Sequence, residues 1–234
     1  MITFLLKLLL LGVLFFMIKR VYEMIQYNPN AVILQITKPS QERIQTELKY
    51  KSPLKLSFPQ TQSTTIQDLN QRMPGYMIQE GGSLVSLNQL TQSDTYSIHK
   101  NRAMIQDFQL DSLVSVPMDM LCGLLSCDKT TSLSLYRGPQ DRGLQKIYRE
   151  LYAIQCLSGE IEIYVFNPKH ETDIKGKDIQ DIKKWGMKET LTDQQMIVIP
   201  TEWYYYINSP KEATAVFYEA DTIATWVFNS LRRK

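Results

Sequence analysis

Hydrophobic residues gather first in a nearly continuous run at the amino terminus. Ile2 to Ile18 reads ITFLLKLLLLGVLFFMI, and Lys7 is its only charged residue. At about 1.5 Å per helical residue, the run covers about 25 Å of a hydrocarbon core that is about 30 Å thick. Apolar residues between Val21 and Ile25 extend it, and Lys7 lies close enough to the amino end to reach the headgroups. The pattern predicts a single transmembrane helix over residues 1–26.

A cleaved signal peptide or a buried amphipathic helix would also give an apolar run. In a signal peptide the charges precede the run and a small-residue cleavage site follows it. Here Lys19 and Arg20 follow the run, and the sequence after it has no cleavage pattern of that kind. These features favour a retained helix that contacts membrane lipid through residues 2–18. The positive-inside rule then predicts that the rest of the chain lies on the cytosolic face.

The carboxyl half has a different pattern, in which short apolar or alternating runs are separated by turn residues. Between Glu160 and Phe166, alternation places Ile161, Ile163 and Val165 on one buried face. The tight turn from Leu157 to Glu160 predicts an antiparallel hairpin with the run before it. The predicted strands, seven in all, are Thr131 to Tyr136, Leu151 to Leu157, Glu160 to Phe166, Gln195 to Ile199, Trp203 to Asn208, Thr214 to Tyr218 and Thr222 to Phe228.

Proline interrupts the segment that joins these two regions. Prolines at 29, 39, 53 and 59 lack a backbone donor and exclude a long helix over residues 27–65. This segment is predicted to be a stalk with two short strands, near Ala31 to Ile36 and Leu54 to Phe58. Helical spacing follows over Thr65 to Met73 and, more weakly, over Asp107 to Leu125. We therefore predict an anchor over 1–26, a stalk or linker over 27–65 and a domain over 66–234, with its core in residues 113–228.

Composition narrows the classes of function. The 234 residues are 44% hydrophobic and 21% charged, as expected of a chain that folds around a core. The net charge of +2 excludes nucleic-acid binding through charge alone. Two histidines and three cysteines exclude a His-rich metal site and a disulfide framework. Cys122, Cys127 and Cys156 are predicted to be reduced, with a Cys122–Cys127 bridge left open, and the alternating strand around Cys156 favours a core thiol over a nucleophile.

Two motifs of the carboxyl half have a residue order that is known from other proteins. The first is GPQDRGLQKIYRE, residues 138–150, with a glycine turn at Gly159, and the second is VIPTEWYYYI, residues 198–207. Over residues 113–228 the chain resembles the cupin superfamily, particularly the cupin-like branch related to JmjC oxygenases. The resemblance implies a mostly β fold: a cupin double-stranded β-helix, or jelly roll, with flanking helices, preceded here by the transmembrane helix.

Metal-binding relatives hold Fe(II) or another divalent ion at three positions of these motifs. The corresponding residues here are Leu144, Lys146 and Tyr205. Leucine offers no lone pair, protonated lysine repels a cation and a neutral phenol is a poor ligand. Ile161 stands where the oxygenases place the lysine that holds 2-oxoglutarate. The resemblance therefore implies a degenerate site with no metal, no cofactor and no catalytic residue.

The remaining polar and aromatic candidates fall into three groups. His99 and His170 are predicted to lie at the surface, because neither has a second histidine at chelating spacing. Alternation points Tyr205 inward, and Tyr204 and Tyr206 to the other face of their strand. The residues that would form a polar pocket floor are Lys146, Glu150, Trp203 and Tyr205, of which Lys146 and Glu150 are close enough in the motif to pair.

These patterns favour a non-catalytic, membrane-anchored, cupin-like protein that acts as a structural or binding module at a membrane surface and contacts a protein partner. Anchored cupin-like chains look similar to proteins of large nucleocytoplasmic DNA viruses, and the Ile, Lys, Tyr and Asn content suits an AT-rich genome, so a virion membrane is an expected location. Exposed strand edges favour a homodimer. Two alternatives stay open: an Fe(II)- and 2-oxoglutarate-dependent JmjC-type dioxygenase with an atypical ligand set, and a cupin that binds a polar ligand.

Overall fold

The computed structural model describes residues 2–58, 64–80, 83–123, 126–138 and 143–232. Its centre is a ten-stranded mixed sheet. The strands of this sheet are β1 (Leu34–Ile36), β2 (Leu54–Ser57), β5 (Tyr96–Asn101), β6 (Ser126–Gly138), β7 (Gln145–Lys146), β8 (Leu151–Gly159), β9 (Ile161–Phe166), β10 (Gly186–Leu191), β11 (Gln195–Val198) and β12 (Tyr204–Thr222).

The long strand β12 joins the two parts of the sheet. Its first residues, Tyr204 to Asn208, pair with β9, and β7 pairs with the same end. From Ala213 to Thr222 it lies between β6 and β8. The main path runs β1-β2-β11-β8-β12-β6-β5, with β10 on the far side of β9. Only the β1–β2 pair is parallel among the pairs of this sheet that the structure describes.

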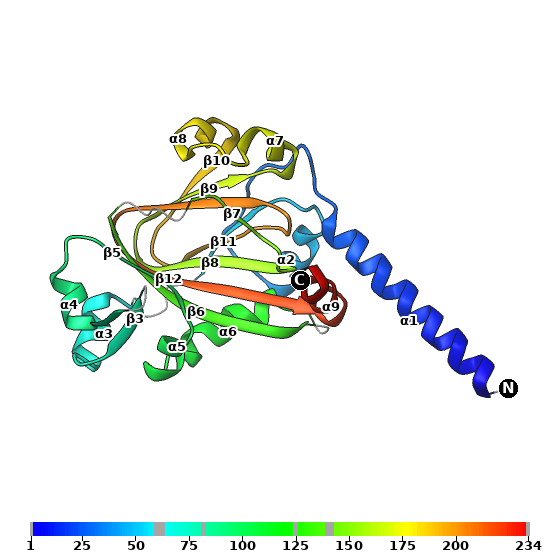
Figure 1. Ribbon diagram of the computed structural model, residues 1–234, viewed down its shortest axis with the longest axis horizontal. Coiled ribbons are helices and arrows are strands. Elements are labelled where there is room, and N and C mark those ends of the chain that lie inside the picture. The colour runs from blue at the N-terminus through cyan, green and yellow to red at the C-terminus, as the bar shows by residue number, and fades with distance from the viewer. Residues whose placement is uncertain (1, 59–63, 81–82, 124–125, 139–142, 233–234) are drawn as a thin grey trace.

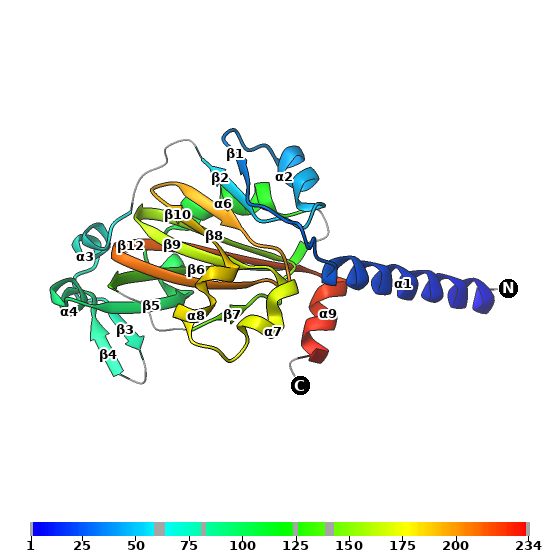
Figure 2. The same cartoon turned by 90° about the horizontal axis from the view of Figure 1, so that it is seen from above.

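Helices, most of them short, lie around the sheet (Figures 1 and 2). They are α1 (Ile2–Ile25), α2 (Gln41–Leu48), α3 (Ile66–Arg72), α4 (Leu87–Gln92), α5 (Ala103–Asp107), α6 (Asp111–Leu121), α7 (Glu171–Ile174), α8 (Ile179–Ile182) and α9 (Ile223–Arg232), with 3-10 turns η1 (Pro168–His170) and η2 (Lys183–Trp185). The two-stranded sheet of β3 (Met77–Glu80) and β4 (Ser83–Ser86) lies with α3 and α4 at one end of the body. At the other end α1 projects away from the body, as Figures 1 and 2 both show.

The predicted mostly β jelly roll is wrong. Helix and strand are present in nearly equal amounts, 38% and 37%, and the sheet is mixed and not closed. The cause lies in residues 41–121, where apolar side chains of short helices pack onto one side of the sheet. Ile44, Leu69, Met104 and Phe108 are all buried in that core. Helical spacing in the sequence predicts helices only over Thr65 to Met73 and, more weakly, over Asp107 to Leu125, so α2, α4 and α5 are not predicted.

The predicted transmembrane helix is also wrong. In the part of the chain that the structure describes, no helix combines the length and the hydropathy that a membrane crossing requires. Residues 2–25 nevertheless form one continuous helix, α1.

Six of the seven predicted strands are present, but two of them, Trp203 to Asn208 and Thr214 to Tyr218, are parts of the single strand β12. The seventh, Thr222 to Phe228, is wrong because α9 begins at Ile223. Its β-branched residues suit a strand. Here the backbone N–H of Thr222 donates to the hydroxyl oxygen of Thr225 at 2.9 Å, which closes the first helical turn.

The predicted hairpin between β8 and β9 is wrong, although the turn is in place. Gly159 adopts φ +86°, a conformation that favours glycine, and reverses the chain there. After the turn the two strands separate, so that β8 pairs with β11 and β12 while β9 pairs with β10 and β12. The predicted alternation is confirmed, since Ile161, Ile163 and Val165 are buried.

Segment 27–65 contributes β1, α2 and β2 directly to the main sheet and its core. The parallel strands β1 and β2 lie at the edge of the sheet, and β2 pairs with β11. The two short strands predicted for this segment are therefore confirmed. Ile36, Leu54 and Leu56 are buried in the same core as the helices that cover the sheet.

Candidate functional site

The surface of α1 is the most unusual feature of the molecule. Twelve large apolar residues between Phe4 and Ile18 are 51–71% exposed, and they occupy every side of the helix. The exposed residues are Phe4, Leu5, Leu6, Leu8, Leu9, Leu10, Leu11, Val13, Leu14, Phe15, Phe16 and Ile18. A helix that is apolar all round is normally surrounded by other apolar material. This part of the molecule is therefore the first candidate for a binding surface.

The base of α1 is tied to the body by a group of charged side chains. Arg20 forms a close ion pair with Glu150, which lies just before β8. The other oxygen of this carboxylate accepts hydrogen bonds from the hydroxyls of Thr222 and Thr225, each at 2.8 Å. Burial lowers the pKa of Lys51, and Glu150 and Arg20 shift it in opposite directions. These charges fix the direction in which α1 leaves the body.

A second charged group lies beside the first, around Arg149. Its guanidinium donates to Asp221 at 2.6 Å, forms a close pair with Asp128, and reaches Glu219 at 3.4 Å. The side chain of Asp221 is completely buried. Burial by itself lowers the pKa of Arg149. Its hydrogen bonds with Asp221 and Asp128 raise the pKa by more than burial lowers it, so the net shift of the pKa is upward. Arg149 is therefore a permanent cation among three carboxylates.

A third group continues from Glu219 into the interior of the sheet. Glu219 accepts from the Lys100 ammonium at 2.5 Å, and the same ammonium lies 4.6 Å from the centroid of the Tyr152 ring. The Tyr152 hydroxyl donates to the Tyr205 hydroxyl at 2.5 Å. Burial lowers the pKa of Lys100 and raises that of Tyr152. The partly exposed Lys100–Glu219 ion pair therefore lies against the ring of Tyr152, whose hydroxyl is bonded to Tyr205 in the core.

The backbone of β5 positions Lys100 for this role. Lys100 has φ +51°, which is uncommon for a residue with a side chain. Its amide donates to the Ser134 hydroxyl, and the β5–β6 register shifts between Ile98 and Asn101. Such bulges redirect a side chain out of the regular alternation.

In the groups around Arg149 and Lys100, cations and carboxylates neutralise one another. Each of Asp128, Glu219 and Asp221 lies against a cationic side chain, and burial makes removal of that cation expensive. Among the described residues, no group of three or more His, Cys, Asp or Glu side chains has an arrangement suited to a metal ion. In this region the geometry suits a rigid polar core.

The three positions predicted to correspond to metal ligands, Leu144, Lys146 and Tyr205, do not converge. Lys146 lies beside Tyr204 in the β7–β12 pairing, with its ammonium 5.0 Å from the Tyr204 ring centroid. Leu144 packs on the same side as Tyr204. Tyr205 points to the opposite side, into the buried cluster that holds Tyr152. The predicted inward direction of Tyr205, with Tyr204 and Tyr206 on the other face, is confirmed.

Of the four predicted pocket residues, Trp203 and Tyr205 share one buried cluster, whereas Lys146 and Glu150 have other partners. The Lys146 ammonium reaches Glu202 at 3.1 Å and Glu171 at 3.4 Å, and it does not pair with Glu150. Glu150 instead holds the base of α1. Trp203 is fully buried in the same cluster as Tyr205.

The cysteines agree with the predictions, whereas His99 is less exposed than predicted. His99, predicted at the surface, is half-buried, and its Nδ1 lies 2.7 Å from the Tyr136 hydroxyl. His170 stacks on Trp185 with a centroid separation of 4.9 Å. All three cysteines are free thiols. Burial raises the pKa of Cys156 to about 12, in agreement with the predicted core thiol.

Four residues of the charged groups, Lys100, Arg149, Glu219 and Asp221, were not predicted from the sequence. A signal for two of them was present, because Glu219 and Asp221 are charged residues inside the apolar run AVFYEADT. A charge within a buried strand requires a partner. The sequence does not reveal which cation that partner is, since Arg149 is some 70 residues away along the chain.

No protein-family model matches this chain, and no curated protein is detectably similar to it in sequence.

Proposed function

We propose that this protein is attached to a lipid membrane through α1 and presents its folded body there as a non-catalytic structural or binding module. The observation that carries the proposal is the exposed apolar surface on every side of α1. A protein partner in a coiled coil covers one seam of a helix and leaves the opposite side in water. Lipid acyl chains surround a helix completely, and they therefore suit this surface best.

The charges at the base of α1 support the same arrangement. Lys7 is the only charged residue before Lys19, and Lys19 and Arg20 mark the point where α1 meets the body. Basic side chains at the end of an apolar helix favour the headgroup region, where they contact phosphates. Because Arg20 is also paired with Glu150, lipid attachment would hold the body at a defined distance from the membrane.

The interior of the body supports a non-catalytic role. Lys100 and Arg149 are both engaged with carboxylates of β12. A catalytic lysine or carboxylate must be able to exchange its partner for substrate. Rearrangement of a buried ion pair costs several kcal/mol, so this group is better suited to holding β5, β6 and β12 together.

Vesicle flotation of the full chain tests the proposal. Leu9→Asp combined with Leu10→Asp places two carboxylates in the middle of α1. Each Asp costs about 3 kcal/mol in an apolar layer, so we expect membrane binding to fall roughly a hundredfold or more. The matched control combines Val32→Asp with Leu84→Asp, two similarly exposed apolar residues of the body, 60% and 67% exposed. The control should float like the unmodified chain.

Equal flotation of the Leu9→Asp, Leu10→Asp variant and the control would contradict the proposal. A second copy of the chain is the competing occupant of α1. In that case the unmodified chain would form a stable oligomer without lipid, and the same α1 variant would be monomeric by light scattering.

A further inference from the structure

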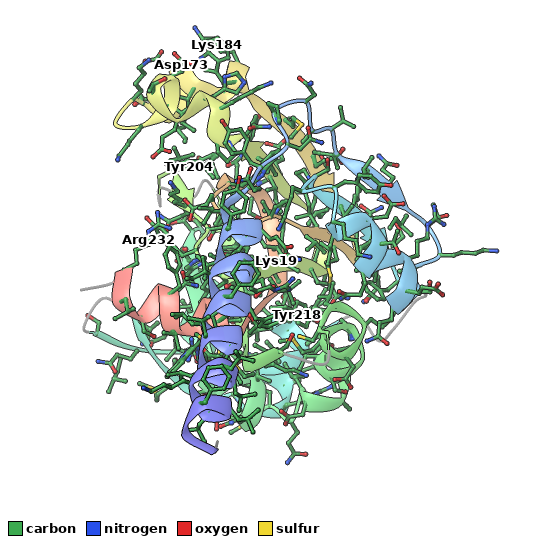
Figure 3. The ribbon with its side chains drawn as sticks, turned by 90° about the vertical axis from the view of Figure 1, so that its right-hand side faces the viewer. Lys19, Asp173, Lys184, Tyr204, Tyr218 and Arg232 are labelled. Atoms are coloured by element: carbon green, nitrogen blue, oxygen red, sulfur yellow. The ribbon has the colours of Figure 1, made fainter. Side chains whose placement is uncertain are left out.

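The carboxyl-terminal helix α9 lies beside the base of α1. Figures 1 and 2 show α9 next to the point where α1 leaves the body, and α9 runs across the direction of α1. The two helices are in contact. Figure 3 looks at the end of the molecule from which α1 projects, and α9 lies on that face, next to α1. A surface that contacts α1 near its base therefore also meets α9.

One side of α9 is fixed to the body by polar contacts. The Asn229 amide donates to the carbonyl of Tyr148 at 2.8 Å and to Asp221 at 3.2 Å. The Thr225 hydroxyl donates to Glu150, the carboxylate that also pairs with α1. Because these residues are buried, α9 has a defined rotation about its own axis.

The other side of α9 carries exposed apolar residues. Ile223 is 64% exposed, Trp226 is 48% exposed and Leu231 is 68% exposed. At about 100° per residue, Trp226, Ile223 and Leu231 fall within an arc of about 140° around the helix, which also contains the exposed Ser230. Since the opposite side faces the body, this apolar side faces outward, at the end from which α1 projects.

We propose that α9 is a second lipid contact, which lies flat at the boundary between headgroups and acyl chains. This inference rests on the proposed attachment of α1 to lipid. Short amphipathic helices bind membranes in this orientation, and tryptophan prefers this depth because its ring is apolar and its N–H is polar. Lipid is favoured over a protein partner because α9 contacts the base of α1 and lies at the same end of the molecule (Figure 2).

Charge at the end of α9 favours anionic lipid. Arg232 lies in its last turn, stacks over the Tyr148 ring with 4.8 Å to the centroid, and is paired with Glu202. Lys19 lies at the base of α1 (Figure 3). These cations would lie at the level of the lipid phosphates, where each basic residue adds to binding.

Tryptophan fluorescence of the full chain tests the position of α9. The chain is mixed with vesicles of phosphatidylcholine and phosphatidylserine whose acyl chains carry bromine, which quenches nearby tryptophan, either close to the headgroup or close to the chain end. We expect stronger quenching by the shallow bromine. Trp185→Phe is the matched control, because Trp185 is 39% exposed on η2, and it should keep this quenching. Trp226→Phe should lose it, since Trp203 is fully buried.

The outcomes separate this inference from the function on which it rests. Flotation of the chain with no quenching of Trp226 would overturn the second contact and leave the attachment by α1 intact. Stronger quenching by the deep bromine would also overturn it, because α9 would then not lie at the boundary. If the chain does not float at all, both proposals fail. A circular dichroism spectrum unchanged by Trp226→Phe shows that the loss of quenching is not caused by unfolding.

Discussion

Two neighbouring residues, Arg149 and Glu150, have different partners. Arg149 holds carboxylates of β6 and β12 together inside the body, through Asp128 and Asp221. Glu150 connects the body to α1 through Arg20. A single short stretch before β8 thus supports both the sheet and the attachment of the amino-terminal helix.

Replacement of Arg149 tests the importance of its charge. Arg149→Met leaves the buried carboxylate of Asp221 without its cation, and breaking a buried pair in this way costs about 3–5 kcal/mol. We expect the free energy of unfolding to fall by about that amount, measured by urea denaturation. Lys211→Met is the control, because Lys211 is exposed and 3.8 Å from its partner Glu160. A loss from Arg149→Met as small as that of the control would show that the buried pair does not stabilise the sheet.

A glycine determines the turn between β8 and β9. A Cβ atom at Gly159 would lie 2.1 Å from the carbonyl oxygen of Glu212, and φ is +86°. Gly159→Ala should therefore lower the free energy of unfolding by at least about 2 kcal/mol. Gly176→Ala is the matched control, since Gly176 also has a positive φ, +74°, but open space around it. If Gly159→Ala lowered the free energy of unfolding by less than Gly176→Ala does, small backbone movements would be relieving the close approach to Glu212, which would contradict this account.

Among the elements, α3 begins with a reciprocal capping arrangement. The Thr65 hydroxyl accepts from the Asp68 amide at 3.1 Å, and the Asp68 carboxylate accepts from the Thr65 amide at 2.8 Å. The sequence placed a helix at Thr65 to Met73, and this prediction is confirmed. It succeeded because capping is local, so a few neighbouring residues contain the whole signal.

The same cap predicts a dependence on pH. Hydrogen bonds from the Thr65 backbone and side chain lower the pKa of Asp68. A lowered pKa in the folded state stabilises the fold above the unfolded value of about 4, and this stabilisation is lost as pH falls through the folded value. We expect Asp68→Asn to be less stable than the unmodified chain near pH 6, with a smaller difference near pH 3, in thermal denaturation. A difference that stays constant with pH would contradict this account.

Pairing between elements was harder to predict than the elements themselves. The turn at Gly159 and the alternation of β9 were both visible in the sequence. The partners of β8 and β9 depend on β12, which is some 40 residues further along and covers both parts of the sheet. For α9, β-branched residues suggested a strand, and the contacts of Thr225 and Asn229 with distant residues decide for a helix. Local propensity gives way to such tertiary contacts.

The whole molecule has two distinct ends. The α1 helix and α9 lie at one end, and α3, α4, β3 and β4 lie at the other. If α1 enters a membrane, the end with β3 and β4 is farthest from the lipid. The amino-terminal apolar run was visible in the sequence, but its relation to α9 was not, because it depends on the fold that brings the base of α1 and α9 together (Figure 2).

The most direct measurement for the central claim is flotation of the full chain with vesicles of neutral phosphatidylcholine at high salt. Salt screens charge attraction but does not weaken the burial of apolar surface. If α1 binds lipid through its apolar surface, as we propose, the chain floats with these neutral vesicles, and salt does not release it. Recovery of the chain in the dense fraction, or flotation only with anionic vesicles at low salt, would contradict the account.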